Sequence, residues 1–201
     1  MRMIARLKIP AVSISNSIAT ALPSVRINND NVGRMAAQYF IGRGRRNFAF
    51  FGRTEFYHAG ERRCGFADEL ARAGLACQTL FVGKKMTCKD RTITAWLKSF
   101  PKPIGLLSHD VYDGRDLIGA CRKLRLRVPD DLAVLAGDND EIECNMCTPP
   151  LSGVVVPFRQ IGYRAALLMD RLLAGAPAPV DPELIKPSRV ATRQSTDTLE
   201  C

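Results

Sequence analysis

Short apolar runs alternate along this chain with longer segments in which apolar residues recur every three or four positions. A short continuous apolar run is typical of a strand that is buried on both faces. Such runs lie at residues 11–15, 47–52, 79–82, 104–107, 132–136, 151–156 and 189–192. We predict a strand at each of them.

The segments between these runs predict helices, because the three- and four-residue spacing places their apolar side chains on one face. The helices are expected after Asp30 and at about residues 61–73, 90–100, 112–126 and 158–173. Asp30 is placed to cap the first helix, and Gly44 and Gly74 are placed to end the first two. Ala73, at the end of the helix expected at 61–73, is expected to face the core. Strands separated by helices predict an α/β fold with parallel sheets and right-handed crossovers.

The length and composition are those of an ordinary globular protein. The chain has 201 residues, of which 46% are hydrophobic, enough for one large domain or two small lobes. No run of about 18 uninterrupted apolar residues is present, and the first residues lack the pattern of a secretory signal. The seven cysteines are odd in number and scattered, so reduced thiols in a cytoplasm fit better than a disulfide framework.

The net charge is strongly positive, but it says less about function than its size suggests. The formal net charge is +9, from 29 Lys and Arg against 20 Asp and Glu, and such an excess can mark a nucleic-acid binder. The basic residues nevertheless come in small groups without interleaved aromatic residues, which solvated surfaces and helix C-termini explain better. No zinc-finger spacing, helix-turn-helix or RNA-binding aromatic motif is found. This chain is therefore not expected to read a DNA sequence itself.

Several short motifs have simple structural explanations. The Gly42–Gly44 stretch ends a helix before a strand, the reverse of a dinucleotide loop. Cys144 and Cys147 have redox or metal spacing, but no second pair or nearby histidine completes a zinc site, and they follow a strand instead of opening a helix. No G-x-S-x-G motif supports a serine hydrolase. We expect no catalytic residue, no metal and no cofactor.

Polar side chains follow three of the predicted strands, at the ends where open α/β sheets bind ligands. They are residues 108–110, residues 138–140 and, after a longer loop, Arg62. Carboxylates accept hydrogen bonds from neighbouring sugar hydroxyls and a guanidinium donates two at once, so the groups predict a polyol site. Helix capping or a turn explains Asp110 or Asp138 taken singly, and residues 138–140 also have the chemistry of a divalent-cation site. Together the three groups favour the sugar.

Four stretches, taken in order, resemble the effector-binding domain of the lactose/galactose-repressor family. They are VRINNDNVGRMAAQYFIGRGRRNFAFFG, ERRCGFADEL, IGLLSHDVYDGRDLIGACRKLRLRVPDDLAVLAGDND and PPLSGVVVPFRQIGYRAALLMDRLLAG. The succession VPDD, GDND and PPLS is the most specific part. The DND after the strand and the ending VATRQSTDTL are most similar to xylose operon regulators, which join this sensor to a C-terminal DNA-binding domain of the arabinose-regulator type.

The resemblance also implies roles for single residues. Arg62 lies where the family has a sugar-binding arginine, in an R-x-x-G-F motif, and Asp138 matches the sugar-binding aspartate after a strand. His109 and Asp110 match an Asn-Asp pair, with histidine in place of asparagine. An imidazole can donate or accept a hydrogen bond but does not offer both from one neutral ring nitrogen. Phe158 matches a residue near the hinge, and either stacks on the sugar or belongs to the core of its helix.

The fold implied by the resemblance is the two-lobed periplasmic-binding-protein-like type I, with three crossings between the lobes. The first lobe would hold about residues 1–45 and 152–176 and the second about 46–151 and 177–195, followed by a tail at 196–201 toward a DNA-binding domain. In the family, two further strand–helix units precede the strand at 11–15, and this chain starts too late to contain them. We therefore expect an incomplete first lobe.

The function implied is that of a cytoplasmic sugar sensor that controls transcription without catalysis. Its partners would be a monosaccharide effector, with a pentose favoured, and a second copy in a homodimer; DNA would be contacted only through a domain missing from this chain, and no membrane is expected. Two alternatives remain. A solute-binding protein for sugar transport shares the fold, and a small α/β enzyme would use Asp110 or Asp138 as acid or base.

Overall fold

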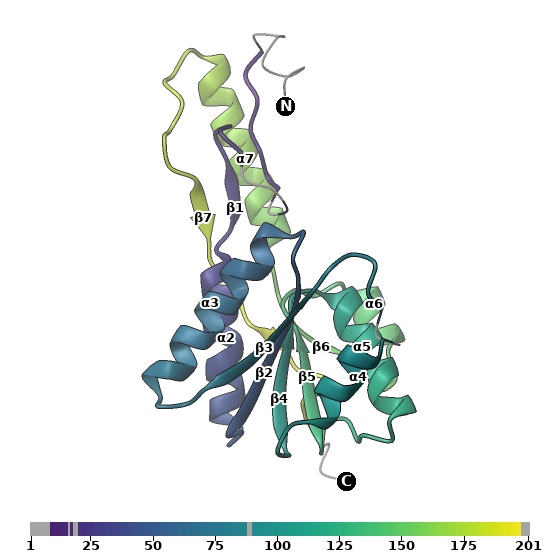
Figure 1. The fold of residues 1–201 in the computed structure, drawn as a ribbon. Helices are drawn as coiled ribbons and strands as arrows, with labels where there is room; N and C mark the ends of the chain where they lie inside the picture. The colour runs from purple at the N-terminus through teal and green to yellow at the C-terminus, as the bar shows by residue number, and fades with distance from the viewer. Residues whose placement is uncertain (1–8, 16, 18–19, 88–89, 198–201) are drawn as a thin grey trace.

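A six-stranded sheet forms the centre of the larger part of the computed structural model (Figure 1). The structure describes residues 9–15, 17, 20–87 and 90–197. The strand order is β3-β2-β4-β5-β6-β8, in which the first five strands are parallel and β8 runs antiparallel to β6. The strands are β2 (Asn47–Arg53), β3 (Cys77–Val82), β4 (Ile104–Ser108), β5 (Leu132–Ala136), β6 (Ser152–Val154) and β8 (Val190–Ala191).

Helices cover both faces of this sheet, which explains why its central strands are apolar without interruption. On one face lie α2 (Asn29–Gly42) and α3 (Tyr57–Arg72), and on the other lie α4 (Arg91–Lys98), α5 (Val111–Lys123) and α6 (Glu141–Met146). Every residue of β4 and β5 is buried between these layers. The expected α/β class with parallel sheets is confirmed.

A smaller part stands beyond the carboxyl ends of the main strands (Figure 1). It consists of β1 (Val25–Ile27) and β7 (Glu183–Ile185), which pair in parallel, and of α7 (Phe158–Leu173). Ile27, Ile161 and Ile185 are buried in the same apolar cluster as α2 and α3, so the two parts share one core. Among the described residues, no helix is long and apolar enough to cross a membrane.

Two glycines let α2 and α3 cross in close contact. A β-carbon on Gly33 would collide with the carbonyl oxygen of Arg62, and one on Gly65 would collide with the carbonyl oxygen of Asp30. Backbone meets backbone at this crossing, which no larger residue permits. The sequence of α2 therefore helps to set where Arg62 lies.

The boundaries of several elements differ from the prediction. Residues 11–15 form no strand, because only Ser13 makes a β-bridge, to Ser24. The helix expected at 61–73 begins at Tyr57 instead, and Ala73 is exposed. Asn28, and not Asp30, caps α2: its Oδ1 accepts from the Asn31 N–H at 3.0 Å. Gly44 and Gly74 do end their helices, with positive φ of 73° and 70°.

Sheet pairing divides the chain differently from the expected lobes. β7 pairs with β1, although residues 177–195 were assigned to the other lobe, while α2 packs against α3 and β6 joins the main sheet. The chain thus passes between the two parts after Ile27, before Phe158 and after Ile185. Thr196, where the tail was expected to start, is buried and its hydroxyl lies 2.6 Å from the Tyr39 hydroxyl.

Candidate functional site

The carboxyl ends of β4 and β5 bring two predicted aspartates together. Ser108 and Ala136 pair in register, so the loops that follow them start side by side. Asp110 caps α5, where its Oδ1 accepts the Asp113 N–H at 2.8 Å. Asp138 reaches over from the β5 loop and accepts the Val111 N–H at 2.8 Å. Both carboxylates therefore sit at the start of α5, where its dipole favours negative charge.

Arg62 lies against these carboxylates and is itself buried, with 3% of its surface exposed. Its Nε donates to Asn29 Oδ1 at 2.9 Å, and its Nη1 donates to the carbonyl oxygen of His109 and lies 3.6 Å from Asp138 Oδ2. Burial lowers the pKa of Arg62, while Asp138 and Asp110 act to raise it. The structure thus brings Arg62, His109, Asp110 and Asp138 together, as the sequence predicted.

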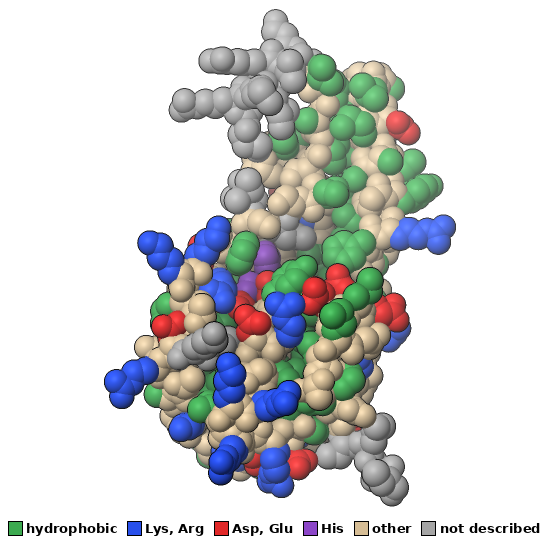
Figure 2. Space-filling model, turned by 90° about the vertical axis from the view of Figure 1, so that its right-hand side faces the viewer, with side chains coloured by type: hydrophobic (Ala, Val, Ile, Leu, Met, Phe, Trp, Pro, Cys, Tyr) green, Lys and Arg blue, Asp and Glu red, His purple; other side chains and the backbone are tan. Residues whose placement is uncertain are grey.

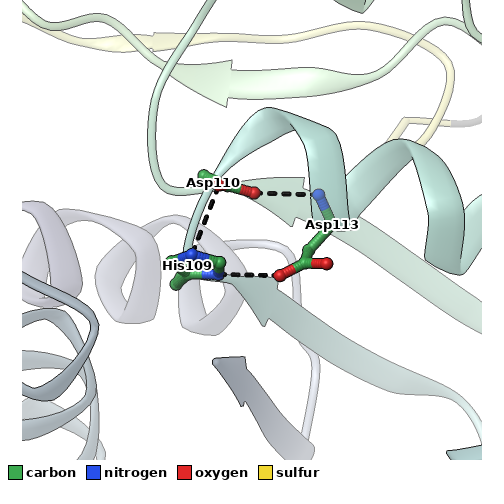
Figure 3. Close-up of side chains that lie close together, drawn as sticks. All are labelled: His109, Asp110 and Asp113. Atoms are coloured by element: carbon green, nitrogen blue, oxygen red, sulfur yellow. Dashed lines mark hydrogen bonds and ion pairs between the residues drawn. The ribbon is translucent and has the colours of Figure 1, made fainter. Parts of the chain in front are cut away.

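His109 differs from the other predicted site residues because its ring is fully buried. Nε2 lies 3.2 Å from Asp110 Oδ2 and Nδ1 lies 3.2 Å from Asp113 Oδ2 (Figure 3). Neither ring nitrogen makes a well-aligned hydrogen bond. The rings of Phe56 and His58 stack near it, with centroids 5.4 and 5.5 Å away. Its side chain lies against Asp110 on the side away from the surface.

Asp113 is a buried carboxylate that the sequence reasoning missed. Arg53, the last residue of β2, binds it through two nitrogens: Nη2 lies 2.6 Å from Oδ1, and Nε lies 2.8 Å from Oδ2. Burial by itself would raise the pKa of Asp113, but the contacts with His109 and Arg53 outweigh it and hold this pKa below its usual value. Asp110 behaves in the opposite way, because burial raises its pKa despite the opposing effect of His109.

Next to these groups is a surface hollow of about 550 Å³. It is lined by Val111, Tyr112, Asp138, Asn139, Asp140, Glu141, Ile142 and Phe158. Phe158 begins α7 and is 63% exposed, so it is not a core residue of its helix. Figure 2 shows histidine, acidic and basic side chains gathered in the recess between the larger part and the part that contains α7. Asp138 belongs both to this hollow and to the group around Arg62.

Two sets of donors have the chemistry of a cation site. His109, Asp110 and Asp113 each place a donor atom within 4.8 Å of the others. Arg53 already binds both oxygens of Asp113, however, and compensates its charge. In the second set, Asp140 caps α6 by accepting the Glu143 N–H at 3.0 Å, and Asp138 accepts the Val111 N–H. These carboxylates are engaged with the protein itself, which does not favour a metal.

Other residues of this network also escaped the sequence reasoning. Asn29 holds Arg62 and donates from Nδ2 to Glu61 Oε2 at 2.8 Å, while Arg26 pairs with Glu61 at 3.0 Å. Asn29 is a polar residue in the first turn of a helix, where the sequence pattern could have drawn attention to it. That it binds Arg62 follows only from the packing of α2 on α3. Arg53 likewise meets Asp113 because β2 and β4 are neighbours in the sheet.

Comparison with known proteins identifies similarity to regulators. The periplasmic binding protein-like domain model matches residues 37–196. A xylose operon regulatory protein from Haemophilus influenzae is 29% identical over 202 residues, covering 94% of this chain and 52% of that protein. The chain therefore spans about half the length of this curated relative.

Solved structures show the same fold. The structure of the xylose-binding transcription activator xylR aligns with a TM-score of 0.86 at 24% identity, covering 100% of this chain and 56% of that one. A periplasmic binding protein/LacI transcriptional regulator from Alkaliphilus metalliredigens, in complex with D-xylulofuranose, aligns with a TM-score of 0.81 at 18% identity, covering 96% and 73%.

Proposed function

Because the chain belongs to the periplasmic binding protein-like domain family, we propose that it is the sugar-binding sensor domain of a transcriptional regulator. The effector is a monosaccharide, and pentoses are favoured since the relatives include xylose operon regulatory proteins. Sugar binding shifts the balance between two arrangements of the lobes and so repositions DNA-binding domains outside this chain. A cytoplasmic location and a homodimer go with this role, and no catalytic step is required.

The observation that carries the proposal is the buried Arg62 beside Asp138. Their closest atoms are 3.6 Å apart, longer than a hydrogen bond, so both groups keep capacity for another partner. A sugar hydroxyl both donates and accepts, and is therefore able to bridge a guanidinium and a carboxylate. Asn29 holds the guanidinium in place through Nε, which lowers the entropy lost when a ligand binds.

The neighbouring hollow supports the same class of ligand. Its volume of about 550 Å³ lies within the range of small-molecule sites, roughly 300–1,000 Å³. Phe158 provides an aromatic ring for the C–H face of a sugar, while Asp138, Asn139 and Asp140 provide oxygen and amide groups for its hydroxyls. An aromatic ring and polar groups in one hollow suit a polyol better than a wholly apolar or wholly charged ligand.

A calorimetric titration of the purified chain tests the proposal, with D-xylose, L-arabinose, D-ribose, D-glucose and D-galactose as ligands. We expect a pentose to bind, and Asp138→Asn to weaken binding by about 1–3 kcal/mol, roughly 5- to 150-fold. Asp170→Asn on α7 is the matched control, since it makes the same charge change at an exposed position outside the hollow.

Four results would speak against the proposed sensor function. No binding of any of these sugars, or equal affinity in Asp138→Asn and the parent, removes the proposed site. Conversion of the bound sugar, followed by proton NMR of the ligand, would favour a small enzyme with Asp110 or Asp138 as acid or base. A solute-binding protein for transport would bind sugar equally well, and it is distinguished by finding that the sugar leaves operator binding by the full-length protein unchanged.

A further inference from the structure

The structure places four ionisable side chains in a row that leads from β2 to the edge of the sugar site. Arg53 binds Asp113 through two nitrogens, Asp113 faces Nδ1 of His109, and Nε2 of His109 faces Asp110 (Figure 3). We propose that Arg53, Asp113 and His109 form a positioning relay that orients the carboxylate of Asp110 toward a sugar hydroxyl. This inference rests on the proposed function.

The first step of the relay is a fixed anchor. Arg53 not only binds both oxygens of Asp113 but also donates from Nη1 to the carbonyl oxygen of Met86 at 2.9 Å. Asp113 is 4% exposed, so its carboxylate is held in one orientation and is shielded from solvent. A bidentate pair of this kind fixes direction as well as position.

The second step is the ring of His109. It is fully buried and sits between two carboxylates, at 3.2 Å from an oxygen of each. Each ring nitrogen therefore faces one of the two aspartates, and the stacked rings of Phe56 and His58 keep the plane of the imidazole in place.

The third step is Asp110 itself. Its Oδ1 is held by the Asp113 N–H, and its Oδ2 is the oxygen that faces His109. With 19% of its side chain exposed, against 13% for Arg53, Asp110 is the most exposed member of the row. Without the ring behind it, the carboxylate would be free to rotate about its cap and would meet a ligand in several orientations.

Ionisable side chains surround the ring of His109. Those that face it or its immediate partners are Arg53 from β2, His58 and Arg62 from α3, Asp110 and Asp113 from α5, and Asp138 from the loop after β5. Arg53 binds Asp113 and Arg62 lies 3.6 Å from Asp138, whereas Asp110 faces the ring of His109.

The relay is tested first in the free protein by nitrogen-15 NMR of the imidazole rings. The chain has two histidines, so His58→Phe assigns the signals. We expect Asp113→Asn to shift the ring-nitrogen signals of His109, because Nδ1 faces the Asp113 carboxylate. Signals of His109 that do not respond to Asp113→Asn overturn the relay, whether or not any sugar binds.

Sugar titration of two His109 variants then separates positioning from mere packing. His109→Gln retains an amide donor near Nε2, so it should keep affinity for the best pentose within about threefold of the parent. His109→Leu should bind at least about tenfold more weakly.

Outcomes for the relay and for the sensor are distinguishable. Sugar binding with the same affinity in the parent, His109→Leu and His109→Gln overturns the relay and leaves the proposed sensor function untouched. No sugar binding by the parent overturns the sensor, and the NMR result then decides the relay. If Asp113→Asn fails to fold by circular dichroism, the difference in sugar affinity between His109→Gln and His109→Leu decides between positioning and packing.

Discussion

Gly33 of α2 lies directly against the carbonyl oxygen of Arg62 in α3. The contact joins a residue with no side chain to the backbone of the residue that carries the buried guanidinium of the site. Asn29, one turn earlier in α2, holds the same guanidinium through its side chain. The packing of α2 on α3 therefore helps to position the candidate ligand site, although α2 does not line the hollow itself.

Gly33→Ala tests this coupling. A methyl group at this position meets three backbone atoms that have no rotamer with which to yield, so α2 and α3 must separate. We expect the free energy of unfolding to fall by about 1–3 kcal/mol and the affinity for sugar to fall with it. Urea denaturation and calorimetry measure the two effects.

Gly42→Ala is the matched control, because it lies in the same helix with open space around its β-carbon position. It should be neutral or should stabilise the protein by up to about 1 kcal/mol. Equal stability of the two variants would show that the crossing has room that the geometry does not indicate.

Phe158→Ala is expected to weaken sugar binding without unfolding the protein. Its ring is 63% exposed, so its removal should change stability by less than about 0.5 kcal/mol. The lost stacking surface should reduce affinity by about 1 kcal/mol, or roughly fivefold. Tyr163→Ala, at an equally exposed position on α7 outside the hollow, should bind like the parent. A loss in both variants would argue against direct contact.

Stability should fall at alkaline pH because of the buried thiol of Cys144. Burial raises its pKa from 9.0 to about 11, so between these values the unfolded chain ionises while the folded protein does not. The stabilisation is complete below pH 9 and is lost as pH rises through 11. From pH 8 to 10, under reducing conditions, the parent should lose on the order of 1 kcal/mol more than Cys144→Ala. Parallel pH profiles of the two proteins would contradict this.

Amide exchange should be faster in β1 and β7 than in β4 and β5. The first two strands pair only with each other among the described elements, whereas β4 and β5 have neighbours on both sides and helices on both faces. A two-stranded pair is marginal in water, and local opening is expected to precede global unfolding there. Hydrogen exchange followed by mass spectrometry measures the difference; equal protection would show one cooperative unit.

The central strands were predictable because burial on both faces leaves an uninterrupted apolar run, as in Leu132–Ala136, where expectation and structure coincide. β1 and β7 were not predictable from the sequence, because each has only three residues and β1 carries Arg26 at its centre. Their pairing joins two segments that are far apart in the sequence. α6 escaped notice for a similar reason: its six residues are too few for a helical period to show.

The site was predictable as far as it follows from strand ends. Asp110 and Asp138 come directly after neighbouring strands, and Arg62 follows a third predicted strand after a longer loop, a placement that the resemblance also implies. The orientation of His109 was not predictable: its ring points into the protein because Asp113 lies one helical turn away and Arg53 anchors that aspartate across the sheet. Such contacts depend on strand order, which the local pattern does not specify.

The sugar site is tested most directly by titrating the nitrogen-15-labelled chain with D-xylose and following every backbone amide. Specific binding should shift the amides of Val111 and of residues 138–142 in a saturable way, because these groups line the hollow or hold Asp138. Asp138→Asn should need a higher sugar concentration for the same shifts, whereas Asp170→Asn should not. Shifts that do not saturate, or that cluster away from the carboxyl ends of β4 and β5, would contradict a sugar site at this edge of the sheet.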